Sequence, residues 1–449
     1  MQENELMGSM KVSKAVAKMA IPSVISSLVT VVYNMADTFF VGQTGDPLQV
    51  AAVSLTNPIF ILFMAFANMF GMGGSAAASI AMGEKDDKRM KNVSAFVTYA
   101  SLIVGIALCV ILMVGMRPIL GVFGANEQTY AFAQGYTFHI AYGAPFIIWS
   151  AAASFVVRAE GASREAMIGS MIGTILNITL DPLFISGFGM GAAGAAIATT
   201  IGNVCASAYY LWYFVKKSKA FSIHFKYFTC KNCVLSSVCM MGFPTAIFSM
   251  LMSVSTIVLN QILVAYGNAP VAAIGIVFKA NMFITFLQMG IANGVQPLFG
   301  YNYGAGNWER FVTVERYTKK CCLIVGILAT ALFFVLREPI IRLFIDDQEV
   351  VAYGVQMLSA YMISGPVIGI LFVNMNCMQS IGKALPATVL SVMRQGLLLI
   401  PLLYLLNAVL GLQGVIYGQA LTDYAAVRTG KGRDIMRSMV LWRSMRQKI

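Results

Sequence analysis

Apolar residues along this chain come in runs of about twenty or more, and short polar loops separate the runs. A helix needs about 20 apolar residues to cross the hydrocarbon core of a bilayer. The period-two alternation of outer-membrane barrels is absent. The pattern therefore predicts an all-α polytopic membrane protein with about twelve transmembrane helices. The predicted spans are residues 14–39, 51–80, 93–116, 132–156, 166–187, 191–215, 236–265, 271–299, 318–336, 353–378, 384–408 and 412–427.

Composition and charge support this class. Hydrophobic residues make up 58% of the chain and charged residues 11%, whereas about a quarter of the residues of a soluble protein are charged. The net charge of +12 could suggest nucleic acid as a partner, but the basic residues gather in alternate loops. The other loops hold only Arg117, Arg337 and Arg342. By the positive-inside rule, the sequence predicts a cytoplasmic-membrane protein with both termini in the cytoplasm and no nucleic-acid partner.

The two halves of the chain resemble each other at an offset of about 220 residues. The segment "AIPSVISSLVTVVYN" at 20–34 matches "GFPTAIFSMLMSVST" at 242–256, and Gly83 falls opposite Gly304. Because the offset spans six crossings, the halves have the same orientation, related by a pseudo-two-fold axis along the membrane normal. The predicted units are an N-terminal six-helix lobe (1–215), a cytoplasmic linker (216–235), a C-terminal six-helix lobe (236–427) and a basic cytoplasmic tail (428–449). The linker could also form an amphipathic helix on the inner leaflet.

Pro22 and Pro244 lie inside their predicted helices. A proline removes a backbone N–H and its ring clashes with the preceding turn, so each helix is expected to bend there. At Pro22 the bend is either a static kink, which neighbouring helices compensate, or a bend that moves during transport.

A few ionisable residues fall inside the predicted spans, where their burial is costly and points to function. Asp37 lies in the first span, and "NITLD" in the fifth places Asn177 and Asp181 four residues apart on one helix face. Two carboxylates in a low-dielectric pocket cannot both ionise cheaply, so a proton or a small cation should neutralise them. With the amide of Asn177 and the hydroxyl of Thr199, the four residues predict a coupling site for H⁺ or Na⁺.

Each carboxylate also has a simpler interpretation. Asp181 could cap a helix end before Pro182, and Asp37 could lie at the outer interface in contact with water. The repeat places apolar residues, near Leu259 and at Leu402, opposite the two aspartates. Coupling chemistry is therefore predicted for the first lobe only.

Uncharged polar residues and one lysine are candidates for lining a central cavity. They are Asn34, Gln261, Lys279, Gln288 and Asn374. Lys279 could line the cavity or pair with Asp423, or it could extend its ammonium group to the membrane interface.

Four segments carry a resemblance to a known family: "PSVISSLVTVVYNMADTFFVGQTGD", "RAEGASREAM", "NITLDPLFI" and "QPLFGYNYGAGNWER". Across nearly its whole length the chain resembles the multidrug and toxic compound extrusion (MATE) family. The resemblance implies two six-helix lobes in a V, and export of cationic or amphiphilic organic compounds in exchange for H⁺ or Na⁺. It also implies that Asp37, Asn177, Asp181 and Thr199 correspond to the first-lobe cation site of the bacterial and archaeal branch.

The chain departs from the family pattern at its end. After about residue 427 the sequence is too charged to continue an apolar helix. Either the twelfth helix is short, with local thinning of the bilayer, or the C-terminus is altered.

The sequence thus predicts a monomeric, cation-coupled antiporter that works by alternating access on small organic cations or amphiphiles and needs no cofactor. The alternative is a lipid-linked oligosaccharide flippase of the same superfamily, which should have a cavity rich in Arg or Lys. Only about two basic residues lie within spans, which disfavours that alternative. No enzyme is predicted, because the two histidines, His139 and His224, form no cluster with a nucleophile.

Overall fold

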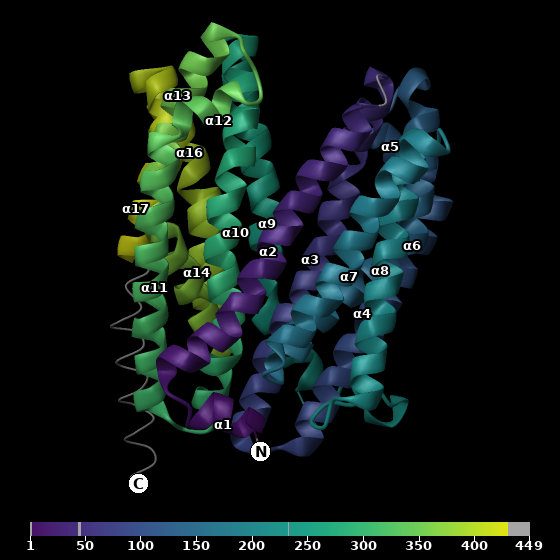
Figure 1. The fold of residues 1–449 in the computed structure, drawn as a ribbon, viewed down its shortest axis with the longest axis vertical. Coiled ribbons are helices and arrows are strands. Elements are labelled where there is room, and N and C mark those ends of the chain that lie inside the picture. The colour runs from purple at the N-terminus through teal and green to yellow at the C-terminus, as the bar shows by residue number, and fades with distance from the viewer. Residues whose placement is uncertain (1, 44–45, 232, 430–449) are drawn as a thin grey trace.

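The computed structural model describes residues 2–43, 46–231 and 233–429, and all regular elements in these ranges are helical (Figure 1). The first half contains α1 (Gln2–Gly8), α2 (Val12–Gly42), α3 (Pro47–Glu84), α4 (Asp87–Val114), α5 (Met116–Val122), α6 (Glu127–Ala159), α7 (Ser163–Pro182), the π-helical turn η1 (Leu183–Gly187) and α8 (Gly191–Lys216). The all-α prediction is confirmed. The predicted basic tail lies outside the described residues from 430 onward.

The second half repeats this order. It contains the 3₁₀ turn η2 (Phe225–Tyr227), α9 (Val234–Val264), α10 (Asn268–Gly304), α11 (Trp308–Val335), α12 (Arg337–Arg342), α13 (Gln348–Ile363), α14 (Gly365–Ser380), α15 (Ala384–Val392), the π-helical turn η3 (Met393–Leu397), α16 (Leu399–Leu410) and α17 (Leu412–Thr429). The described part of the final helix, α17, covers 18 residues.

Helices fill all twelve predicted spans. Among the residues that the structure describes, nine helices are long and apolar enough to cross a membrane, and the pair α13–α14 would be a tenth span with a 46° bend. Pro366, in the first turn of α14, lacks the N–H that would continue α13. The predicted spans 191–215 and 412–427 form α8 and α17, which do not meet that criterion.

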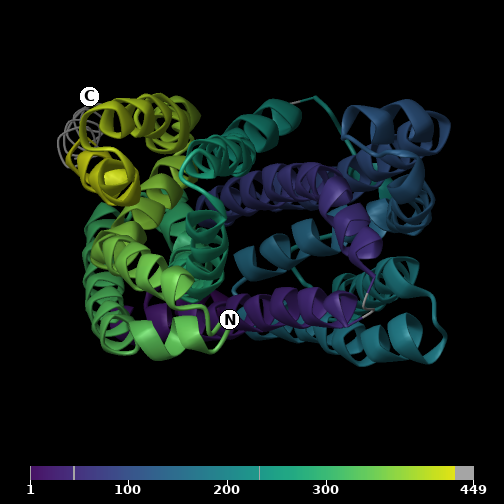
Figure 2. The same cartoon turned by 90° about the horizontal axis from the view of Figure 1, so that it is seen from above.

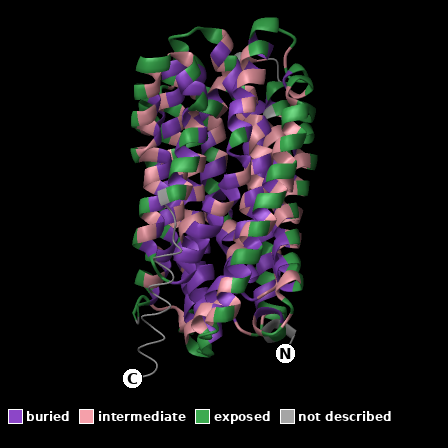
Figure 3. Ribbon diagram, turned by 90° about the vertical axis from the view of Figure 1, so that its left-hand side faces the viewer, coloured by how far each residue is buried: buried purple, intermediate pink, exposed green. Residues whose placement is uncertain are grey.

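The helices form two bundles that meet at the end holding the N-terminus and separate toward the other end, in a V (Figure 1). Seen from above, the bundles lie side by side (Figure 2). Exposed residues lie mainly on the outer faces of the helices, and buried residues are most frequent in the half of the molecule that holds the N-terminus (Figure 3). This is the arrangement of two six-helix lobes that the resemblance implies.

Glycines allow backbone contact where the lobes meet. A Cβ atom added at Gly304 of α10 would lie 2.1 Å from the carbonyl oxygen of Ile80, and one at Gly83 of α3 would lie 2.1 Å from that of Tyr301. Side chains at these two positions would force α3 and α10 apart. The two glycines are the pair that the repeat places opposite each other, so the contact is close to symmetric.

The first helix of each lobe also packs against the other lobe. Helix α2 packs on α10, and its repeat counterpart α9 packs on α3. At these crossings Gly242 of α9 faces the carbonyl of Met69, and Gly294 of α10 faces the carbonyl of Met19. The packing of α2 on α10 and of α9 on α3 thus holds the two lobes together.

Helix α1 packs at the same end of the molecule. Leu6 and Met7 are buried, and the carbonyl oxygen of Met7 accepts hydrogen bonds from Asn302 Nδ2 (3.3 Å) and Arg310 Nε (3.1 Å). These donors come from α10 and α11, so the N-terminal segment is attached to the second lobe.

The segment between the lobes is not the amphipathic helix considered above. Between α8 and α9 it forms a single 3₁₀ turn, η2. Tyr99 of α4 donates a hydrogen bond to the carbonyl of Ile223 (2.9 Å), and Ser94 contacts both backbone groups of Ser222. The segment therefore lies against the first lobe.

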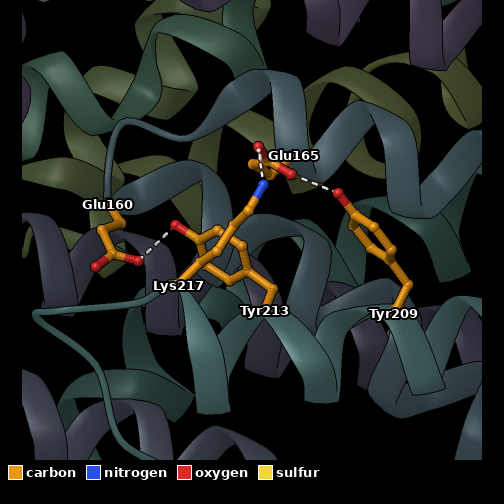
Figure 4. Close-up of polar contacts among 5 residues, drawn as sticks. All are labelled: Glu160, Glu165, Tyr209, Tyr213 and Lys217. Carbon is orange, nitrogen blue, oxygen red and sulfur yellow. Dashed lines mark hydrogen bonds and ion pairs between the residues drawn. The ribbon is translucent and has the colours of Figure 1, made fainter.

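A buried glutamate fixes the start of this segment (Figure 4). Glu160 has no exposed surface. Its carboxylate accepts hydrogen bonds from the hydroxyls of Tyr213 (2.8 Å) and Ser218 (2.9 Å) and from the backbone N–H groups of Lys219 and Ala220 (both 3.0 Å). Beside it, Glu165 accepts from Tyr209 and pairs with Lys217 (Figure 4).

Glu160→Ala should lower the melting temperature of the purified protein markedly, because it leaves several buried donors without an acceptor, at a cost of about 3 kcal/mol or more. Thermal unfolding in detergent measures the shift. Glu84→Ala is the control, since Glu84 forms only an exposed ion pair with Arg89. Equal shifts in the two variants would contradict this role for Glu160.

Gly304→Val should weaken the contact between the lobes, because the new side chain would occupy the space of the Ile80 carbonyl. The distance between spin labels on the two lobes, measured at the N-terminal end, should increase. Gly275→Val on the same helix is the matched control, because a Cβ there meets no atom within 4 Å. An unchanged distance distribution in Gly304→Val would argue against the contact.

Candidate cation-coupling site

Three helices of the first lobe bring the predicted site residues together. Helix α2 carries Asp37, α7 carries Asn177 and Asp181, and α8 carries Thr199, and α2 packs on both α7 and α8. Asn177 Nδ2 donates to Thr199 Oγ1 at 3.1 Å. Asp37 interacts electrostatically with Asp181. The four residues thus lie close together in the first lobe, and their role as a coupling site stays a prediction.

The acceptors in this cluster lack partners. Asp181 has no exposed surface, and Asn177 and Thr199 are 3% and 4% exposed. In the described part of the chain, both carboxylate oxygens of Asp181 and the amide oxygen of Asn177 are buried without a hydrogen-bond donor. Burying such atoms unpaired is costly, so the arrangement fits a proton or a small cation bound between them.

The capping interpretation of Asp181 finds no support in the structure. The Asp181 carboxylate accepts no hydrogen bond from the backbone, and the helix does not end there but continues through Pro182 into the π-helical turn η1. The N–H of Phe188 bonds the carbonyl of Leu183 at 2.8 Å, five residues earlier. Such turns are frequent at functional sites. Asp37 is half-buried on α2.

Two tyrosines that sequence reasoning did not include also belong to this cluster. The hydroxyl of Tyr33 lies 3.4 Å from Thr199 Oγ1, and Tyr33 and Tyr136 both interact electrostatically with Asp37 and Asp181. Tyr33 is four residues before Asp37 and so shares its helix face, a signal that was readable. Tyr136 comes from α6, and only the packing of the lobe brings it here.

A sodium ion at this position would be bound by two carboxylates and by neutral oxygens. Within residues 2–43, 46–231 and 233–429, no group of three or more His, Cys, Asp or Glu residues is arranged to hold a metal ion. Hard oxygen donors are the ligand type that suits Na⁺, and the carboxylate, amide and hydroxyl oxygens here are of that type.

The predicted cavity-lining residues differ in burial and in their hydrogen bonds. Gln288 is fully buried, and its Nε2 donates to the carbonyls of Cys322 (3.0 Å) and Gly365 (3.2 Å), so it joins α10, α11 and α14 instead of lining a cavity. Asn34 donates to the carbonyl of Thr30 in its own helix at 2.9 Å. Gln288 thus has a packing role, whereas the prediction that Asn34 lines a central cavity stays a prediction.

Three more candidates lie away from the cavity in the second lobe. Gln261 is exposed on α9, Asn374 is buried within α14, and Lys279 is half-buried on α10. None of them lines the cavity of about 340 Å³ in that lobe. The suggested pairing of Lys279 with Asp423 is wrong, because Asp423 Oδ1 pairs with Arg394 Nε at 2.7 Å.

Comparison with known proteins agrees with this architecture. The MatE family model matches residues 22–183 and 244–405, one match for each half of the chain. The chain is 31% identical to the multidrug export protein MepA of Staphylococcus saprophyticus and 32% identical to that of Staphylococcus aureus strain NCTC 8325, in each case over 92% of this chain and 91% of the relative. A solved structure described as the outward-facing conformation of a multidrug resistance MATE family transporter superposes with a TM-score of 0.93. It shares 24% identity, and the match covers 98% of this chain and 99% of that one.

Two repeated helical lobes that meet at one end, with buried polar clusters inside them, are the architecture of a multi-pass membrane transporter. The two matches to the family model and the identity to curated relatives show that the chain belongs to the MatE (MATE) family.

Thr199→Val should destabilise the first lobe, because the isosteric change removes the hydroxyl that accepts from Asn177 and contacts Tyr33. A lost buried hydrogen bond costs about 1–3 kcal/mol, so the melting temperature should fall by several degrees. Thr179→Val on α7 is the control, since Thr179 is exposed and bonds only carbonyls of its own helix. If both variants melt like the parent, the hydroxyl of Thr199 has no such role.

Proposed function

We propose that this protein is a secondary antiporter that exports cationic or amphiphilic organic compounds in exchange for H⁺ or Na⁺, which binds at Asp37, Asn177, Asp181 and Thr199. The observation that carries the proposal is the group of unpaired acceptor oxygens of Asp181 and Asn177, buried beside Asp37. The names of the relatives, multidrug export proteins, support the substrate class.

The coupling follows from charge. Two nearby carboxylates in a poorly solvated pocket favour uptake of a positive charge. A proton or Na⁺ that loads the pocket neutralises it and weakens its attraction for an organic cation, which then leaves. Empty of the small ion, the pocket regains negative charge and attracts the next organic cation.

Helix α2 offers a connection between the pocket and the lobe interface. It carries Asp37 near its C-terminal end, where it packs on α7, and Pro22 nearer its start, on the part that packs on α10. The helix is continuous through Pro22. A change at the pocket that alters the bend at Pro22 would alter the packing of α2 on the second lobe, which is a route to alternating access.

The orientation follows from the positive-inside rule. The basic loops and the N-terminus lie at the end where the lobes meet, so we assign that end to the cytoplasm of a cell bounded by a cytoplasmic membrane. In this orientation the V opens to the outside, where the coupling ion enters. We assign a cytoplasmic C-terminus on the same grounds, and the monomeric state stays a prediction.

The flippase alternative finds less support. Of the two basic residues that lie away from the ends of the predicted spans, Arg394 pairs with Asp423, and Lys279 does not line the cavity of the second lobe. A pyrophosphate group would therefore meet one partly neutralised cation and no cluster of basic residues.

Asp37→Asn should abolish most of the gradient-driven export of a cationic dye such as ethidium, because the pocket loses one of its two titratable groups. Dye transport in proteoliposomes under an imposed pH or sodium gradient measures this. Asp346→Asn, at an exposed acidic residue outside the pocket, is the control and should transport normally. Unchanged gradient-driven export in Asp37→Asn would overturn the coupling assignment, and the gradient that drives the parent protein identifies the ion.

A further inference from the structure

The second lobe contains a cavity that the proposed coupling mechanism does not use. Its volume is about 340 Å³, and residues from α9, α10, α13, α14, η3, α16 and α17 line it. Most of the wall is apolar and aromatic, with Phe248, Phe278 and Tyr361 among the lining residues. A volume above about 300 Å³ with an apolar wall and a few polar groups is typical of sites for small organic ligands.

The repeat relates this cavity to the acidic pocket of the first lobe. With Pro22 opposite Pro244, Tyr33 falls opposite Ser255, and with Gly191 opposite Gly411, Thr199 falls opposite Gln419. Ser255 and Gln419 both line the cavity. The same position in the repeat therefore carries two carboxylates in the first lobe and a pair of opposite charges in the second.

That chemistry centres on a buried ion pair. Arg394 and Asp423 are 5% and 0% exposed, and Arg394 Nε donates to Asp423 Oδ1 at 2.7 Å. Gln419 Nε2 donates to the same oxygen at 3.2 Å. The pair makes the cavity neutral overall, so it lacks the negative charge that attracts cations to the first lobe.

Arg394 lines the cavity and has donors that no other residue in the described part of the chain uses. Its guanidinium carbon lies 5.4 Å from the ring centroids of both Phe248 and Phe372, which hold it in place. In the described part of the chain, the one hydrogen bond that the Arg394 side chain makes is the bond from Nε to Asp423. The terminal nitrogens therefore have N–H groups to offer to a ligand, while Asp423 holds the charge balance.

The backbone around Arg394 is also unusual. Arg394 and Gln395 lie in the π-helical turn η3, where the N–H of Leu398 bonds the carbonyl of Met393 at 2.8 Å. The hydroxyl of Ser255 donates to the carbonyl of Gln395. This bond ties η3 to α9, so the wall that carries Arg394 is braced across the lobe.

We propose that this cavity is an organic-ligand site for compounds in which an apolar or aromatic body carries a hydrogen-bond-accepting end, a carboxylate or a carbonyl, that Arg394 binds. The proposal rests on the transporter function proposed above and extends its substrates beyond cations. A zwitterion or a neutral amphiphile would bind here through Arg394, whereas a simple organic amine would bind more weakly, through its apolar body.

Three probes with similar bodies and different ends test this: 4-phenylbutyrate, 4-phenylbutyramide and 4-phenylbutylamine. Their dissociation constants are measured by ligand-observed NMR with the full-length protein in nanodiscs, and empty nanodiscs correct for binding to lipid. The double variant Arg394→Leu/Asp423→Leu removes both charges together, so that no unpaired charge stays buried. It should bind the carboxylate and the amide about tenfold more weakly, as expected for one lost charge-assisted hydrogen bond, and the amine unchanged.

A second variant tests the cavity without changing its charges. Thr256→Phe fills space at a lining position and should weaken carboxylate and amide binding to a similar degree, while Thr179→Phe, on the exposed side of α7, should not. The proposal is overturned if both cavity variants bind the carboxylate and the amide like the parent, or if the amine loses as much affinity as they do. These measurements need no ion gradient, so a failure of coupling at Asp37 and a failure of this site give different results.

Discussion

The backbone contact between the two lobes is the constraint on which the rest of this structure depends. Gly83 and Gly304 let α3 and α10 cross with no side chain between them, and α2 and α9 each pack against the opposite lobe beside this crossing. The lobes meet at one end and diverge toward the other (Figure 1). A carrier that alternates between two open states needs a contact that holds the lobes together in one state and that can break in the other.

Helix α2 takes part both in the contact between the lobes and in the charged cluster. One part of α2 belongs to the lobe interface, and the other part belongs to the cluster with Asn177 and Asp181. Packed protein interiors respond to local change by shifting whole elements, because they have few voids to absorb it. A helix shared by the charged cluster and the interface is therefore well placed to couple the two, and Pro22 gives it a point of weaker hydrogen bonding.

The two lobes use one scaffold for different chemistry. Each has a π-helical turn in its fifth long segment, η1 after Asp181 and η3 around Arg394, and each has a buried polar cluster nearby. In the first lobe the carboxylate oxygens of Asp181 have no donor. In the second, Asp423 pairs with Arg394 through one oxygen. The second oxygen of Asp423 has no donor, but the charge of Asp423 is paired with Arg394, whereas Asp181 has no cationic partner among the described residues. This difference in charge pairing is the basis of the two different ligands proposed for the two lobes.

The sequence by itself determined the all-helical class, the positions of the spans and the repeat, because these depend on local apolar runs and on the need to satisfy backbone groups in lipid. It also determined that Asn177 and Asp181 share a face, since a spacing of four residues is a property of one helix. Only the tertiary structure decided which distant groups meet: Tyr136 beside the aspartates, Gln288 bonded to two carbonyls instead of facing a cavity, and Arg394 rather than Lys279 as the partner of Asp423. Such choices depend on the rotation of each helix about its axis and on which helices become neighbours, and no local pattern encodes either of these.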